Sequence, residues 1–348
     1  MKFKRIWVLF LARNREFLRD RSGFGWNILF PFLIVAGFGL IYNSDGREVY
    51  KVGIFPVKEI AGQELYIPGG LADHPLLRLI PFETRQEAME KLRHHKVAIV
   101  VENRMPGLRY WINDASPQGA VAEIIVREAS LDRGLVEAAV DKQEIPGVRI
   151  RYIDWLFPGI LGMNIMFSAF FGVSYVIARY RRNGVLKRLK ATPVTAFEYL
   201  TSQLLSRVAV LVFSSVIVWI GCDFLFSFHV LGAWTDLCLV FLAGICCMVA
   251  FGLVVACRGT NEELTNGIIN FISWPMMFLS EVWFSIEGAA PWVRGLAECF
   301  PLTHFLRAAR LVINEGAGLA QVSVEMTAMA GFSIVFLLVG AYFFSWTR

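Results

Sequence analysis

The sequence lacks the short motifs that bind nucleotide phosphates or hydrolyse peptides and esters. The phosphate-binding pattern G-x-x-x-x-G-K-[ST] occurs nowhere in its 348 residues, and H-E-x-x-H and G-x-S-x-G are also missing. These absences exclude the usual routes to ATP hydrolysis and to metal- or serine-dependent hydrolysis. We therefore predict that the chain is not an enzyme and has no catalytic residue.

Cysteine is also scarce, because the chain has only six. Residues 43–154 contain none, and no two cysteines have the C-x-x-C spacing of zinc or redox sites. The sequence therefore predicts neither a disulfide framework nor a metal site.

Charged residues make up only 18% of the chain, whereas 56% of its residues are hydrophobic. A soluble domain is far less apolar than this, and a helix needs about 20 apolar residues to cross a bilayer. We predict an α-helical integral membrane protein surrounded by membrane lipid. Its six expected transmembrane helices are 23–42, 155–177, 201–222, 237–257, 264–280 and 326–346.

The basic residues indicate how these helices are oriented. Seven lysines and arginines lie in the first 22 residues and six lie in 178–199, whereas the loop at 224–236 has none. Since Lys and Arg are enriched in cytoplasmic loops, we predict that both termini are cytoplasmic. The net charge of +5 then reflects orientation, and no nucleic-acid partner is expected.

Residues 43–154 are too polar for a membrane and must lie outside if the first two helices span it. We expect a small α+β extracytoplasmic domain here, because strand-like and helix-like patterns follow one another in the order strand, helix, strand, strand, helix. The expected strands are 49–57, 96–102 and 108–113, and the expected helices are 84–95 and 117–142.

Two further segments are predicted to lie at the membrane surface. Residues 1–22 form an amphipathic interfacial helix, either as a basic anchor or as a surface for a partner. Residues 284–318 are too polar to span and too apolar for a loop. They are expected to be a re-entrant pair of short helices broken at Pro291 and Pro301.

The segment R-R-N-G-V-L-K-R-L-K-A-T-P-V-T-A-F-E-Y-L at 181–200 interrupts two apolar runs. It begins with a short amphipathic helix whose apolar and basic residues face opposite ways (Val185, Leu186 and Leu189; Lys187, Arg188 and Lys190). Pro193 ends this helix, and Thr195 and Glu198 fit a capping box that starts the next one. A loop that only orients the protein through its positive charges would not need one helix to end and another to begin here. We therefore predict a rigid helix that a partner can contact.

A few polar or aromatic residues stand out within the apolar helices. Asn266, Asn270 and Trp274 share one helix face, and Asn164 and Phe167 lie in the second expected span. These side chains either hold helices together through hydrogen bonds or line a translocation path.

Two charged residues also lie at or near these spans. Glu281 follows the fifth span and either faces water at the bilayer boundary or lines the same path. Arg207 lies about two turns into the third helix, and we expect its side chain to reach the cytoplasmic interface.

The segment from Arg181 to Val194 resembles the coupling segment of type-2 ATP-binding-cassette (ABC) exporter permeases. Gly184, Leu189, Thr192 and Pro193 occupy the positions that match the family pattern. W-P-M-M-F-L-S-E-V-W-F-S at 274–285 and F-P-L-T-H-F-L-R-A-A-R-L at 300–311 also resemble family segments. The element order is similar to that of the subfamily with a large extracytoplasmic domain between the first and second spans.

The resemblance implies a permease subunit of an exporter in the plasma membrane, as in a bacterial inner membrane. Separate cytoplasmic ABC ATPase subunits would hold ATP and Mg, so this chain would carry no cofactor, and a second permease subunit would complete a homodimer or heterodimer. The residues implied in coupling are Gly184, Leu186, Lys187, Leu189, Thr192 and Pro193. Those predicted along the path are Asn164, Phe167, Asn266, Asn270, Trp274 and Glu281.

We therefore predict an interfacial helix at 1–22, a first span at 23–42, an extracytoplasmic domain at 43–154 and a membrane domain at 155–348. The membrane domain includes the coupling helix 179–193 and the re-entrant segment 284–318. The predicted cargo is amphipathic or hydrophobic. The alternatives are a membrane-anchored sensor or assembly factor whose outer domain binds a ligand, and a secondary transporter that does not need ATP.

Overall fold

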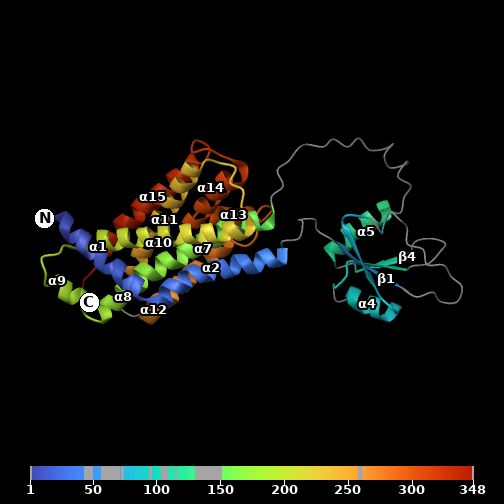
Figure 1. Cartoon of the computed structure of the whole chain (residues 1–348), viewed down its shortest axis with the longest axis horizontal. Helices are drawn as coiled ribbons and strands as arrows, with labels where there is room; N and C mark the ends of the chain where they lie inside the picture. The colour runs from blue at the N-terminus through green and yellow to red at the C-terminus, as the bar shows by residue number, and fades with distance from the viewer. Residues whose placement is uncertain are drawn as a thin grey trace. The chain divides into compact units, whose positions relative to one another are not determined.

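The computed structural model describes residues 2–42, 50–55, 71, 74–93, 96–102, 109–113, 116–129, 151–257 and 262–346. The chain forms two compact units (Figure 1). One comprises Met1–Asn43 with Ile150–Arg348, and the other is Ser44–Arg149. The second unit is therefore an insertion in the sequence of the first.

The smaller unit contains a four-stranded sheet with the strand order β2-β1-β3-β4. Its strands are β1 (Tyr50–Phe55), β2 (Leu77–Pro81), β3 (Ile99–Glu102) and β4 (Arg109–Ile112). Strand β1 pairs in parallel with β2 and β3, whereas β3 and β4 are antiparallel.

Helices α4 (Arg85–Arg93) and α5 (Pro117–Ala129) pack on this sheet through different sets of strand residues. Side chains alternate between the two faces of a strand. Val52 and Ile54 of β1 accordingly join the apolar cluster that contains α5, and Phe55 joins the one that contains α4. The unit thus has a core on each face of its sheet.

The predicted elements of this unit are largely confirmed as β1, α4, β3, β4 and α5. Of the helix expected at 117–142, the structure describes only the first part, and 130–142 lie outside the described residues. Strand β2 was not predicted. It is an edge strand, where Pro81 is tolerated, and its five residues are too few for a clear alternating pattern. The extracytoplasmic position of the unit stays a prediction.

The larger unit is a helix bundle. Its elements are α1 (Lys2–Arg19), α2 (Arg21–Tyr42), α7 (Tyr152–Phe170), η1 (Phe171–Tyr175), α8 (Val176–Arg182), α9 (Val185–Lys190), α10 (Ala196–Phe226), α11 (Trp234–Ala256), α12 (Glu262–Leu279), α13 (Pro291–Ala297), α14 (Pro301–Glu315) and α15 (Ser323–Phe343).

Four helical stretches among the described residues are long and apolar enough to cross a membrane. They are Tyr152–Arg182, Ala196–Phe226, Trp234–Ala256 and Ser323–Phe343, and they coincide with the second, third, fourth and sixth predicted spans. Helix α2 contributes a shorter apolar stretch, Gly25–Gly39. The first and fifth spans therefore stay predictions.

Helix α11 packs against α7, α14 and α15. Gly244 of α11 permits a close approach to α14, because a Cβ at this position would overlap the ring of Phe305. Phe305 is fully buried, and its ring meets that of Phe241 edge-on with centroids 5.2 Å apart. Helix α7 also contacts α2, so it lies between this core and α2.

Residues 284–318 contain two helices, α13 and α14, and each begins at a proline. Pro291 and Pro301 occupy the first turns, where the missing N–H of proline removes no helical hydrogen bond. The predicted pair of helices with breaks at these two prolines is confirmed. Its re-entrant position relative to a membrane is a separate prediction.

Candidate functional site

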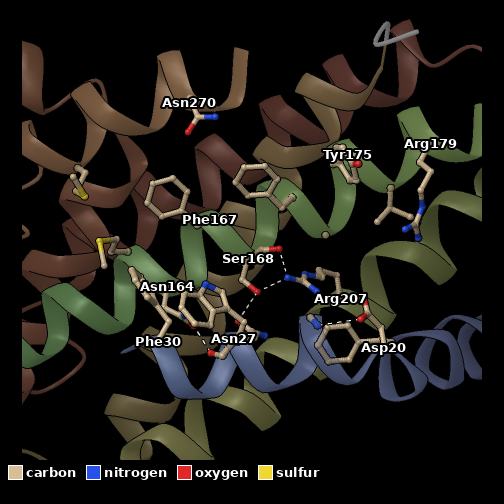
Figure 2. A pocket seen from close by; sticks show the side chains of 18 of the residues that line it. Asp20, Asn27, Phe30, Asn164, Phe167, Ser168, Tyr175, Arg179, Arg207 and Asn270 are labelled. Carbon is tan, nitrogen blue, oxygen red and sulfur yellow. Dashed lines mark hydrogen bonds between the residues drawn. The ribbon is translucent and has the colours of Figure 1, made fainter. Parts of the chain in front are cut away.

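A cavity of about 1190 Å³ lies in the larger unit, with walls from α1, α2, α7, η1, α8, α10 and α12 (Figure 2). Pockets for drug-sized ligands usually have volumes of about 300–1,000 Å³. The cavity is thus large enough for a ligand of that class.

Aromatic and aliphatic side chains form much of the cavity wall. Phe30 and Ile34 come from α2, Phe167 from α7, and Trp274 and Phe278 from α12. The rings of Trp274 and Phe278 stack with their centroids 6.2 Å apart. This wall favours an apolar ligand surface.

A polar cluster lies between α2, α7 and α10 on the same cavity. Asn164 donates a hydrogen bond to the backbone carbonyl of Asn27 over 3.3 Å, and the Ser168 hydroxyl donates to Oδ1 of Asn27 over 2.9 Å. Figure 2 shows the guanidinium of Arg207 directed toward Ser168 on α7. It donates to both the carbonyl and the hydroxyl of Ser168.

Arg207 fits against η1 because residue 172 is glycine. A Cβ at Gly172 would overlap the guanidinium of Arg207. The same stretch, Phe171–Tyr175, is π-helical, and such bulges inside α-helices are frequent at functional sites. Arg207 is only 7% exposed, so our expectation that it reaches the cytoplasmic interface is wrong.

Four of the six residues predicted along a translocation path line this cavity. They are Asn164, Phe167, Asn270 and Trp274. Asn266 does not line it but accepts hydrogen bonds from the Asn270 amide through its backbone carbonyl and its Oδ1, at 2.9 and 3.0 Å. The role of these residues in transport stays a prediction.

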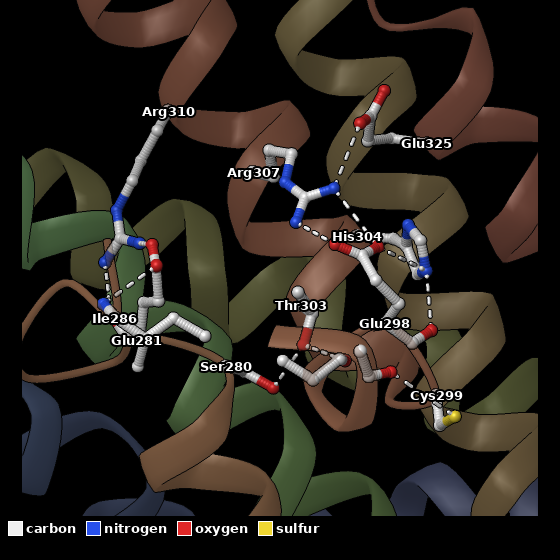
Figure 3. Close-up of polar contacts among 12 residues, drawn as sticks. Ser280, Glu281, Ile286, Glu298, Cys299, Thr303, His304, Arg307, Arg310 and Glu325 are labelled. Atoms are coloured by element: carbon white, nitrogen blue, oxygen red, sulfur yellow. Dashed lines mark hydrogen bonds and ion pairs between the residues drawn. The ribbon is translucent and has the colours of Figure 1, made fainter. Parts of the chain in front are cut away.

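Glu281, the sixth of these residues, does not line the cavity and instead pairs with Arg310 of α14 (Figure 3). The closest carboxylate and guanidinium atoms are 3.6 Å apart, and Arg310 also donates to the Glu281 carbonyl over 2.6 Å. Burial lowers the pKa of Arg310 to about 10, and the Glu281 carboxylate acts in the opposite direction.

A second ion-pair cluster follows at the junction of α13 and α14 (Figure 3). Arg307 donates to both carboxylate oxygens of Glu298 and lies 3.7 Å from Glu325. These hydrogen bonds hold the pKa of Glu298 below its usual value, and burial acts in the opposite direction. His304 contacts the Glu298 carbonyl at 3.0 Å, so Glu298 ties the end of α13 to His304 and Arg307 of α14.

Helix α9 has the predicted orientation. Leu186 is fully buried and Leu189 is partly buried against the core, whereas Lys187, Arg188 and Lys190 are exposed. Gly184 precedes the helix with a φ of 68°, a left-handed conformation that glycine adopts without strain. The two leucines therefore hold α9 in place, and the basic residues face outward.

The end of α9 and the start of α10 also have the predicted geometry. Thr192 donates from its hydroxyl to the Leu189 carbonyl over 2.6 Å. Thr195 and Glu198 form the capping box, because the Glu198 N–H donates to the Thr195 hydroxyl and the Thr195 N–H donates to the Glu198 carboxylate.

The arginines that precede α9 are engaged within the chain. Arg179 lies 2.9 Å from Glu16, and Arg182 lies 3.2 Å from Glu262. Arg181 donates to the carbonyl of Ser345 over 2.9 Å. These three residues therefore brace the larger unit.

Helix α1 contacts both the turn between α9 and α10 and the cavity. Near its start, Arg5 donates to the Pro193 carbonyl over 2.5 Å. Further along, Asn14 accepts a hydrogen bond from Ser206 over 2.8 Å, and Glu16 bonds to Tyr180. Phe17 lies in the cavity wall.

Sequence reasoning missed the cluster of Asn27, Ser168 and Arg207. One available signal was Arg207 itself, which is the single charged residue of the predicted span 201–222. Another was the spacing of Ser168 and Gly172, which lie four residues apart and therefore share a helix face.

Comparison with known proteins adds one finding to this geometry. The model of a family described as "ABC-2 family transporter protein" matches residues 21–342. That range includes α9 and all residues that line the cavity except those of α1 and Asp20. No curated protein matches the chain.

Proposed function

The chain belongs to the ABC-2 family of transporter proteins, and on that premise we propose that it is the permease subunit of an ABC exporter. Family membership makes it a membrane component of a transporter that associates with ATPase subunits. The proposal adds that it exports an amphipathic or hydrophobic molecule, and that cytoplasmic partners hold and hydrolyse the ATP.

The observation that carries the proposal is the orientation of α9. A six-residue helix is not stable by itself, so its packing must hold it in place. Buried Leu186 supplies that packing, and Lys187, Arg188 and Lys190 remain exposed for a partner. Because α9 is fixed by this packing, a movement of the ATPase that displaces α9 would also displace α8 and α10, which flank it.

The proposal includes six transmembrane helices, with both termini cytoplasmic and the smaller unit outside the cell. At 1.5 Å per residue, the 22 residues of α2 extend about 33 Å and the 18 residues of α12 extend about 27 Å. Both lengths are close to the hydrocarbon thickness of about 30 Å. Two permease subunits, identical or related, would then form the complete path.

The cavity supports the proposed substrate class. Aromatic and aliphatic walls suit an apolar body, and the cluster around Ser168 suits a polar group. Asn164, Phe167, Asn270 and Trp274 would contact the cargo directly. Asn266 would position Asn270, and Glu281 would act outside the cavity.

The test uses charge reversal at the exposed face of α9. We expect Lys187→Glu with Arg188→Glu to weaken association with a purified cytoplasmic ATPase subunit about tenfold or more and to abolish transport, because charged contacts between partners become repulsive. Leu189→Asp would instead disturb the packing of α9, so it tests the contact with the ATPase less specifically.

Lys91→Glu with Arg93→Glu is the control, since both residues are also exposed but lie on α4 of the smaller unit. Unchanged ATPase association and transport in the α9 double variant would contradict the proposed coupling. A chain that binds no ATPase at all would favour the sensor or assembly-factor alternative, and transport that needs a proton or sodium gradient but no ATP would favour secondary transport.

A further inference from the structure

The cavity contains a buried cation that has no acidic partner among the described residues. Arg207 is 7% exposed, and its guanidinium contacts the hydroxyl and carbonyl of Ser168 and the ring of Phe17, whose centroid is 5.6 Å away. Burying an uncompensated charge is costly, and an ionisable side chain inside a membrane segment marks a functional site. Its natural partner is an anion.

Two hydrogen-bond donors of this cluster also lack an acceptor in the described part of the chain. They are Nε of Arg207 and Nδ2 of Asn27. Both side chains line the cavity, and Ser168 links them because its hydroxyl bonds to each. Buried donors are normally paired, so two unused donors at one cavity indicate a missing acceptor group.

The other charges on the cavity do not supply that acceptor. Four arginines and two carboxylates line it, which leaves two positive charges in excess. Glu16 is engaged by Arg13 at 3.0 Å and by Arg179 at 2.9 Å. Asp20 accepts from the N–H of Gly23 over 3.0 Å.

We propose that the cavity binds an amphipathic anion, with its acidic group at Arg207 and Asn27 and its apolar body against Phe30, Phe167 and Trp274. The inference rests on the proposed function, because it names the chemical class of the exported molecule. Both a free acid with a long apolar chain and an anionic phospholipid of the bilayer have this chemistry.

The experiment measures ligand binding without ATP or a partner. The full chain in phosphatidylcholine nanodiscs is titrated with dansylaminoundecanoic acid and, separately, with its uncharged primary amide. Binding is followed by energy transfer from tryptophan to dansyl, since Trp26, Trp274 and Trp283 line the cavity. We expect the acid to bind about tenfold to a hundredfold more tightly than the amide, the range for hydrogen bonds to a charged group.

Substitution separates the proposed role of Arg207 from a purely structural one. Arg207→Gln retains a donor for the Ser168 carbonyl but has no charge, so it should bind acid and amide equally. Arg207→Lys should keep a preference for the acid. Arg15→Gln is the control, because it removes the same charge from an exposed position on α1 outside the cavity.

Equal binding of the acid and the amide by the unmodified protein, or an unchanged preference in folded Arg207→Gln, would overturn the anion assignment while leaving the exporter proposal intact. Binding of neither probe would overturn the assignment of the cavity as a ligand site as well. Displacement of the acid by added phosphatidylglycerol would identify bilayer phospholipid as the occupant, and no displacement would favour a free acid.

Discussion

Replacing Leu186 with alanine should release α9 from the bundle. Leu186 has no exposed surface and is the one fully buried side chain of this six-residue helix. Truncating a buried leucine costs about 2–5 kcal/mol, and a helix this short has little stability of its own. Even about 2 kcal/mol raises the equilibrium constant for local opening about 30-fold.

Hydrogen exchange followed by mass spectrometry measures this opening directly, because amide protection reports local unfolding. In nanodiscs, peptides that cover 185–190 should exchange about 30-fold faster or more in Leu186→Ala. Peptides from α11 should exchange at the unmodified rate. Lys187→Ala is the matched control, since Lys187 is the exposed neighbour on the same helix and should leave exchange within about twofold.

If exchange across 185–190 stays the same in Leu186→Ala, the packing of Leu186 does not hold α9. The structural basis for transmitting a displacement through this helix would then be lost. Faster exchange throughout the bundle would show that Leu186 supports the whole larger unit and not α9 in particular.

Three further predictions concern local stability. Thr195→Ala removes the hydroxyl that accepts from the Glu198 N–H and should destabilise the start of α10 by about 1 kcal/mol. The measurement is hydrogen exchange of the amides in the first turn of α10, which should become faster. Unchanged exchange would show that the cap is dispensable. Glu281→Gln leaves the mostly buried Arg310 without its counter-charge. The free energy of unfolding, measured by thermal denaturation, should therefore fall by about 2 kcal/mol, which is less than the loss for a fully buried ion pair. Because Arg307 lowers the pKa of Glu298, this carboxylate stabilises the fold above its unfolded pKa of about 4.3, and that contribution should disappear as the pH falls through the lower folded value. Glu298→Gln should lack this part of the pH dependence, and an identical pH profile would contradict the assignment.

The features that sequence patterns predicted well are governed by neighbouring residues. The capping box of Thr195 and Glu198 needs only a spacing of three, and Pro291 and Pro301 start helices through the geometry of proline itself. The two faces of α9 follow from helical periodicity in the same way.

The features that were missed depend on contacts between distant segments. The burial of Arg207 requires Gly172, which is far away in the sequence and lies in a π-helical turn that no local pattern announces. Asn164 and Asn270 could be marked as polar residues in apolar helices. Only packing shows that they meet at one cavity, and that Glu281 belongs instead with Arg310.

Helix α1 imposes a mechanical constraint on the larger unit. Its 18 residues extend about 27 Å as one rod, pinned at Pro193 through Arg5 and at the cavity wall through Phe17. A rod fixed at two points cannot lengthen, so a shift of the segment after α9 must either tilt α1, and thereby reshape the cavity, or break one of its attachments. As long as both attachments hold, a movement of the segment after α9 therefore also changes the shape of the cavity.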